Sequence, residues 1–170
     1  MCNGCKWGPQ MKLWVRLLGM GIIMAMGVAA GAWAQSAEEL EAAGLLHFKK
    51  AYYEALPQKK AADAGEEFRR AEAAFRGAIK QNPQRVPAYL HLGRTLFVQE
   101  KYPEAAVIYG EALKIDPGNK PVYLQLASAR EMAGDKVGAV EALELLRAME
   151  DDPQAIEMID NLIARMRAKQ

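Results

Sequence analysis

The sequence predicts an all-α fold in which helical hairpins stack side by side. Three observations predict it. Three alanines recur along the chain at one constant spacing, at Ala71, Ala105 and Ala139. Each alanine is followed one helical turn later by a large apolar side chain, at Phe75, Tyr109 and Leu143. No stretch alternates polar and apolar residues as a strand would, and self-similarity at this period is typical of helical repeats.

Residues 86–119 form the clearest unit. Its first helix is expected to carry one apolar stripe, made by Tyr89, Leu92 and Leu96. Gly93 lies beside this stripe and allows a neighbouring helix to approach closely. The second helix ends at the Asp-Pro-Gly stop of residues 116–118. A single pair of this size cannot bury its apolar face, so stacked pairs must share one core.

The preceding unit, residues 35–85, departs from the strict register. That register would place Pro57 in a helix interior, where proline is not tolerated. A better first helix lies upstream, around Gly44. The stretch of sequence from this glycine to Ala71 is more than twice as long as the equivalent stretch of the middle unit. We therefore expect an insertion here, which extends the first helix to about Leu56 and lengthens the turn over residues 57–65.

The chain continues with a weaker copy of the unit, residues 120–153, and a capping helix, residues 154–170. In the copy, Arg130 stands where a large apolar residue is expected. The final helix has one apolar face, which suits the terminal element of a stack, made by Ile156, Ile159, Leu162, Ile163 and Met166. The full set of expected helices is 37–56, 64–81, 87–99, 103–115, 121–133, 136–150 and 154–168.

The middle unit resembles the tetratricopeptide repeat. The resemblance covers a large residue, Leu-Gly, a second large residue, and then alanine, an aromatic residue, alanine and proline at the family's spacing. It implies a right-handed α-solenoid of about three helix-turn-helix units. It also implies that the first helix of each unit lines a concave groove that holds a peptide or helix.

Transferred position by position, the resemblance places Leu90, His91, Arg94 and Phe97 of the middle unit in the groove, and Leu124, Gln125, Ser128 and Glu131 of the next unit. Six of these are the predicted binding residues: Leu90, Arg94, Phe97, Leu124, Gln125 and Ser128. The first unit would add Glu41, Leu45 and Phe48. The family's Lys and Asn clamp for a terminal carboxylate is missing, because Leu90 and Leu124 occupy its lysine positions. The lining therefore fits an amphipathic or extended segment better. The alternative is that these two leucines only pack between units.

The insertion offers a second surface. Aromatic and aliphatic residues follow one another at helical spacing where the repeat supplies no standard partner. Phe48, Tyr52 and Tyr53 form either an exposed aromatic patch for another protein or a face that docks on the long turn.

The sequence indicates no catalytic, cofactor or metal site. His47 and His91 are the only histidines, and neither has a partner at metal-ligand spacing. No serine or threonine after residue 34 lies in a nucleophile motif. The net charge of +1 does not call for nucleic acid. We therefore predict a non-catalytic adaptor whose partner is another protein.

Residues 1–34 are predicted to be a secretory signal peptide. Lys12 and Arg16 form a positive region before an apolar stretch over residues 17–30. The stretch ends in small residues that a signal peptidase accepts, at Ala32 and Ala34. Met11 is an alternative start. Both cysteines of the chain precede the apolar stretch, so the rest of the protein has none.

The competing interpretation is an uncleaved anchor in which residues 13–34 form a transmembrane helix. The uncharged stretch between Arg16 and Glu38 is just long enough to cross a bilayer. The positive flank keeps the N-terminus cytoplasmic, so the body is exported in either case. In a Gram-negative cell it would be periplasmic, or anchored in the inner membrane and facing the periplasm.

The predicted role is an adaptor in the assembly of an envelope complex, and membrane contact arises only through an uncleaved N-terminal segment. The alternatives are a membrane-anchored scaffold and an accessory subunit of an envelope enzyme.

We expect the exported protein to begin at Gln35, because the peptidase site is good and the apolar stretch is marginal as an anchor. Intact-mass measurement of protein purified from the cell envelope checks this. A mass that retains residues 11–34 would make the anchored scaffold correct.

Overall fold

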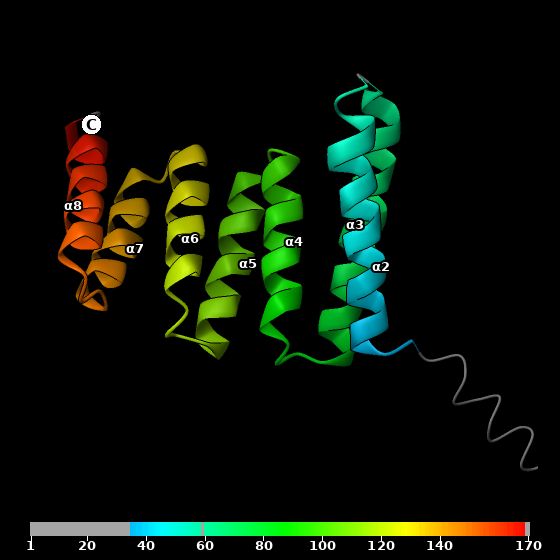
Figure 1. Cartoon of the computed structure of the whole chain (residues 1–170), viewed down its shortest axis with the longest axis horizontal. Helices are drawn as coiled ribbons and strands as arrows, with labels where there is room; N and C mark the ends of the chain where they lie inside the picture. Colours follow the sequence, from blue (N-terminus) through cyan, green and yellow to red (C-terminus); the bar gives the residue numbers. More distant parts are fainter. Residues whose placement is uncertain (1–34, 59, 169–170) are drawn as a thin grey trace, which may run out of the picture. The chain divides into compact units, whose positions relative to one another are not determined.

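The computed structural model describes residues 35–58 and 60–168, and within them it contains seven α-helices, one π-helical segment and no strand. These are α2 (Ala37–Lys49), η1 (Lys50–Ala55), α3 (Ala61–Gln81), α4 (Val86–Val98), α5 (Tyr102–Ile115), α6 (Lys120–Met132), α7 (Lys136–Ala148) and α8 (Pro153–Ala168). Each helix packs against the next one along the chain, and α2 also contacts α4. Figure 1 shows the helices side by side in one row, in sequence order. The predicted stack of helical hairpins is confirmed.

Local sequence explains where the helices begin. At the start of α2, the Ser36 hydroxyl accepts a hydrogen bond from the Glu39 N–H, and the Glu39 carboxylate accepts one from the Ser36 N–H, both at 3.1 Å. This reciprocal pair satisfies two backbone donors that the helix end leaves free. Helices α4, α5 and α6 each carry a proline in the first turn, where its missing N–H removes no helical hydrogen bond.

Within a hairpin, the two helices meet where an aromatic ring covers a glycine. A Cβ atom on Gly93 of α4 would lie 2.5 Å from Cε1 of Tyr109 on α5. A Cβ atom on Gly44 of α2 would lie 2.6 Å from Cε1 of Phe75 on α3. Both rings are buried. The absent side chain therefore allows each ring to lie flat against the first helix, as the sequence predicts for Gly93.

Between hairpins, one hydrogen bond recurs at the repeat period. The Tyr89 hydroxyl donates to the Pro83 carbonyl at 3.0 Å, and one repeat later the Tyr123 hydroxyl donates to the Pro117 carbonyl at 3.1 Å. Each bond ties a first helix to the turn that precedes it. The rest of the stripe of α4 is fully packed, because Leu92 and Leu96 are at most 1% exposed.

The insertion lengthens both helices of the first hairpin. The first helix of this hairpin, α2 together with η1, is six residues longer than α4. Helix α3 is seven residues longer than α5, and the turn between the two helices is two residues longer than the turn between α4 and α5. The prediction of a long turn over residues 57–65 is therefore wrong. Helix α3 already begins at Ala61, because this stretch is rich in alanine, a strong helix former, and Ala64 is buried against η1 and its neighbours. The last six residues of the first helix are π-helical, which periodicity did not predict.

Helix α8 closes the row. Its buried face consists of Ile159, Ile163 and Met166, while Ile156 and Leu162 are half-buried. Ion pairs at its surface join it to α7: Arg147 Nη2 lies 3.1 Å from Asp160, and Arg167 lies 2.5 Å from Glu144. One apolar and one polar face are what a terminal element of a stack requires.

The predicted signal peptide, residues 1–34, lies outside the described residues. In the described part of the chain, no helix combines the length and the apolar character that crossing a membrane requires.

The glycines supply a matched stability test. We expect Gly93→Ala to lower the free energy of unfolding by ~1–3 kcal/mol, because the new methyl group overlaps the buried Tyr109 ring. Gly110→Ala on α5 meets no atom within 4 Å and should raise it by ~0.5–1 kcal/mol, because alanine is the better helix former. Urea denaturation measures both. Changes of the same sign and size would contradict the packing described above.

Candidate functional site

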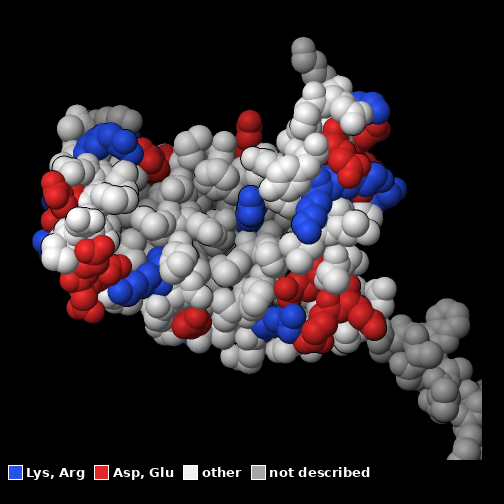
Figure 2. Space-filling view, viewed as in Figure 1, with Lys and Arg blue, Asp and Glu red and all other residues white. Residues whose placement is uncertain are grey.

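The middle of the row carries a hollow in a nearly uncharged surface. In Figure 2, acidic and basic side chains gather over α2 and α3 at one end and over α7 and α8 at the other, while the visible surface between them is largely white. A hollow of about 320 Å³ opens in this part of the row. It is lined by Arg94, Phe97, Tyr109, Leu124, Gln125 and Ser128. We call it the central hollow.

The repeat architecture brings these side chains together. Helix α4 supplies Arg94 and Phe97, and the equivalent helix of the next unit, α6, supplies Leu124, Gln125 and Ser128. Five of the six groove residues expected from the sequence therefore line one hollow. The sixth, Leu90, is half-buried, packs against the core and is not part of the lining. That the hollow binds a partner remains a prediction.

Tyr109 is the lining residue that the sequence analysis missed. It comes from the second helix, α5, and its ring is only 2% exposed. Its hydroxyl makes no hydrogen bond to any described residue, and it borders the hollow. Burial raises the pKa of Tyr109 to about 12, against a smaller opposing effect of Arg94, so the phenol is neutral at pH 7 and can donate. The sequence held one signal for this role: position 109 is a tyrosine, whereas the equivalent positions of the other two units are Phe75 and Leu143.

Arg94 is the only Lys or Arg residue of α4. Its guanidinium carbon lies 5.2 Å from the centroid of the Phe48 ring. No carboxylate of the described chain lies within ion-pair distance of it. The aromatic wall beside it is fixed, because the Phe97 ring packs edge-on against Tyr102 with centroids 5.1 Å apart.

A second, smaller hollow of about 90 Å³ lies on the other side of Arg94. Besides Arg94 it is lined by Leu45, Phe48, Lys49, Tyr53, Phe75 and His91. Two of the three residues expected from the first unit, Leu45 and Phe48, therefore face a hollow. The third does not: Glu41 is buried and accepts a hydrogen bond from Arg85. The His91 ring stacks on Phe75 at 5.4 Å, and burial lowers the pKa of His91.

The expected aromatic patch is smaller than predicted. Phe48 is 6% exposed, because its ring packs edge-on against Phe68 with centroids 5.8 Å apart and lies under Arg94. It is therefore not a surface residue. Tyr52 and Tyr53 remain at the surface, at 37% and 62% exposure, and contact each other edge-on at 5.0 Å.

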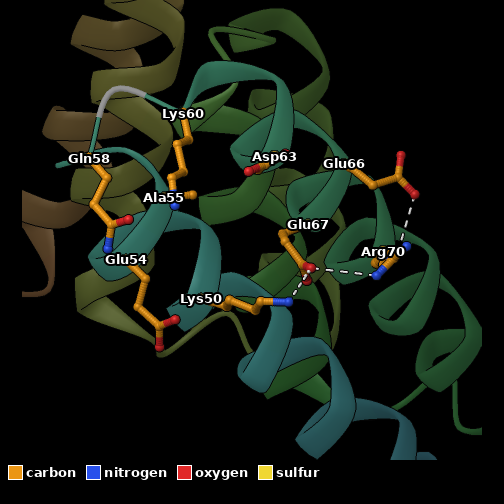
Figure 3. Close-up of a pocket in the computed structure, with 9 residues that line it drawn as sticks. All are labelled: Lys50, Glu54, Ala55, Gln58, Lys60, Asp63, Glu66, Glu67 and Arg70. Atoms are coloured by element: carbon orange, nitrogen blue, oxygen red, sulfur yellow. Dashed lines mark hydrogen bonds and ion pairs between the residues drawn. The ribbon is translucent and has the colours of Figure 1, made fainter.

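The tip of the long first hairpin contains a hollow of different chemistry (Figure 3). It has a volume of about 340 Å³ and is lined almost entirely by charged side chains from η1, α3 and the turn between them. At its base the Glu67 carboxylate accepts hydrogen bonds from Lys50 at 2.7 Å and Arg70 at 3.5 Å, and it lies 2.6 Å from His47 Nδ1. Glu67 is 6% exposed and joins the two helices.

The described residues contain no group of three or more His, Cys, Asp and Glu side chains that could hold a metal ion. The chemistry available in the central hollow is that of recognition: one guanidinium, three neutral polar groups and two apolar walls.

Comparison with protein families identifies the repeat. Two family models, both described as tetratricopeptide repeat, match residues 59–120 and 96–165. A search of curated proteins finds no match.

Solved structures agree with the fold. The TPR2B domain of yeast Sti1, in its pHsp70 complex, is 21% identical, with a TM-score of 0.60 over 79% of this chain and 98% of that one. The type III secretion translocator chaperone SycD of Yersinia enterocolitica is 16% identical, with a TM-score of 0.60 over 84% and 93%. SycD in complex with a peptide of the translocator YopD gives 15% identity and a TM-score of 0.51 over 69% and 87%. At these identities the likeness shows the fold alone.

Glu67 makes the stability of the long hairpin depend on pH. Hydrogen bonds from Lys50 and His47 lower its pKa from 4.5 to about 2. A carboxylate whose pKa is lower in the folded state contributes stability above its unfolded pKa and loses it as the pH falls toward the folded value. We therefore expect stability to decrease as the pH falls from about 4.5 to about 2. Glu67→Gln should flatten this decrease.

Urea denaturation at several pH values measures the slope. Glu157→Gln, at an exposed position of α8, is the control. Some slope should remain in both variants, because neighbouring cations also lower the pKa of Glu66 and Glu72. Equal slopes in the two variants would rule out the role given to Glu67.

Proposed function

The chain belongs to the tetratricopeptide-repeat family over residues 59–165, and from this premise we propose that it is a non-catalytic adaptor that binds a segment of another protein across α4 and α6. The observation that carries the proposal is the central hollow, where exposed side chains of two successive first helices meet. Its lining combines apolar side chains, Phe97 and Leu124, with polar ones, Arg94 and Tyr109 among them.

The size and chemistry of the hollow suit a peptide segment. About 320 Å³ lies at the lower end of the range for ligand pockets, and it is open enough to take one or two side chains of an extended chain or a helix. Aromatic and arginine side chains carry much of the energy of protein interfaces. The complexes of yeast Sti1 with pHsp70 and of SycD with a YopD peptide support the same use of the fold by analogy.

We place this adaptor in the cell envelope, periplasmic in a Gram-negative cell, where it helps to assemble an envelope complex. The support is the sequence of residues 1–34, with its positive start, apolar stretch and peptidase site. A scaffold that keeps residues 13–34 as an anchor, or an accessory subunit of an envelope enzyme, would use the same groove.

The groove assignment is tested with Phe97→Ala, Arg94→Ala. Neither side chain belongs to the buried stripe of α4, so the double variant should stay folded. A partner is first identified by photo-cross-linking from position 128, which lies exposed in the central hollow. We expect the double variant to lose ~2 kcal/mol or more of binding free energy for that partner, measured by calorimetry.

The matched control removes one apolar and one basic side chain from the opposite helix of the same unit, with Val107→Ala, Lys114→Ala on α5. Val107 is 63% exposed and does not line the central hollow. The control should bind normally. If a folded groove variant also bound normally, the site would lie elsewhere, with Tyr52 and Tyr53 as the next candidates.

A further inference from the structure

We infer that the groove recognises an internal acidic side chain of its partner, an Asp or Glu with apolar residues on both sides, and that Arg94 and the Tyr109 hydroxyl bind its carboxylate. The inference rests on the proposed function and adds the chemical class of the segment that is bound. It draws on three independent features: a guanidinium without an ion pair, a tyrosine hydroxyl that donates to no described residue, and the position of Arg94 between two hollows.

The first feature is charge. The arginines that link neighbouring helices elsewhere in the row are paired: Arg85 with Glu38 and Glu41, Arg147 with Asp160, and Arg167 with Glu144. Arg94 has no such partner among the described residues, and neither has Lys49, which lines the smaller hollow. His91, which lines the same hollow, lies 3.7 Å from the Glu41 carboxylate, and that carboxylate is already engaged by Arg85. The groove is therefore electropositive at its centre, and an anionic partner is the complementary one.

The second feature is the phenol of Tyr109. The Tyr109 ring is buried, but its hydroxyl oxygen is not among the buried polar atoms that lack a partner, so solvent can reach it. It donates to no described residue and is therefore available to donate to a ligand. The ring packs against Gly93, the residue lines the central hollow together with Arg94, and the phenol remains protonated at neutral pH. A carboxylate accepts from both donors, and hydrogen bonds with one charged partner are stronger than neutral ones.

A neighbouring ring helps to position the guanidinium. Its central carbon lies 5.2 Å from the centroid of the Phe48 ring, within cation–π distance, and Phe48 is itself packed on Phe68. The planar guanidinium has a fork of N–H donors that matches a carboxylate, and no described residue forms an ion pair with it. A lysine at the same place would lack this fork of donors.

The third feature decides between an internal acid and a free C-terminus. Arg94 borders both hollows, so apolar walls lie on either side of it: Phe97 and Leu124 on one side, Leu45 and Tyr53 on the other. A segment that ended at Arg94 would leave one of the hollows empty. A segment that passes over Arg94 places an acidic side chain at the centre and an apolar side chain in each hollow, which buries more apolar surface.

The experiment uses the purified full chain and peptides of controlled chemistry. Random peptides are selected for binding from two libraries, one displayed inside a carrier loop with neither terminus free and one displayed with a free C-terminus. Each selected sequence is then synthesised in matched forms that differ in one feature: Glu or Gln at the acidic position, and a blocked or a free C-terminus. Affinities are measured for the unmodified chain and for Arg94→Gln, Tyr109→Phe and Phe97→Ala. Tyr109→Phe keeps the ring over Gly93, so it should not disturb folding.

We expect the selected peptides to carry an acid between apolar residues, and Glu→Gln to weaken binding about tenfold or more. Arg94→Gln should abolish the difference between the Glu and Gln peptides, and Tyr109→Phe should reduce it. Phe97→Ala should weaken both peptides equally. These results would separate recognition of the carboxylate from binding in the groove.

Two outcomes would overturn the inference alone: peptides that need Phe97 but bind equally with Glu or Gln, or peptides that bind only with a free C-terminus. The groove would then still be a binding site. If no selected peptide were affected by Phe97→Ala, the proposed function would fail as well.

Discussion

The close approach of an aromatic ring to a glycine is the constraint on which the rest of the structure depends. It fixes the distance between the two helices of the first and middle hairpins, where Phe75 covers Gly44 and Tyr109 covers Gly93. The same two rings also border surface hollows: Tyr109 lines the central hollow and Phe75 lines the smaller one. A packing contact inside the middle hairpin therefore also places a tyrosine at the central hollow.

Stacking and charge act together on the groove. Because the hairpins repeat, the first helices α4 and α6 present exposed residues to one side, and a continuous lining forms from side chains that belong to successive repeats of the sequence. Ion pairs between helices satisfy the charges toward both ends of the row. Arg94 is the only charged residue of α4, and no carboxylate of the described residues forms an ion pair with it. The same architecture thus leaves the Arg94 charge without an ion pair beside the apolar walls of the central hollow.

The sequence predicts most of the fold because the repeat encodes it. Helix α4 was expected over 87–99 and spans Val86–Val98, and α5 was expected over 103–115 and spans Tyr102–Ile115. The first hairpin was less predictable, because an insertion has no second copy to compare, and both its longer α3 and its π-helical segment arise from packing of that hairpin alone. The role of Tyr109 was hidden for another reason: its packing position is evident in sequence, but the direction of its hydroxyl is a property of three dimensions.

The hollow at the tip of the first hairpin and the central hollow have similar volumes. They differ in whether their polar side chains already have partners within the protein. The former has about 340 Å³ and the latter about 320 Å³. At the tip, Glu67 is bound by Lys50, His47 and Arg70, so a ligand that claims any of these groups must first break an existing pair, and a buried charge that loses its partner is strongly destabilising. In the central hollow, Arg94 has no ion pair and Tyr109 no hydrogen bond with the described residues, so a carboxylate would gain both contacts without breaking any. The charged hollow therefore stabilises the hairpin, whereas the polar groups of the central hollow remain available to a ligand.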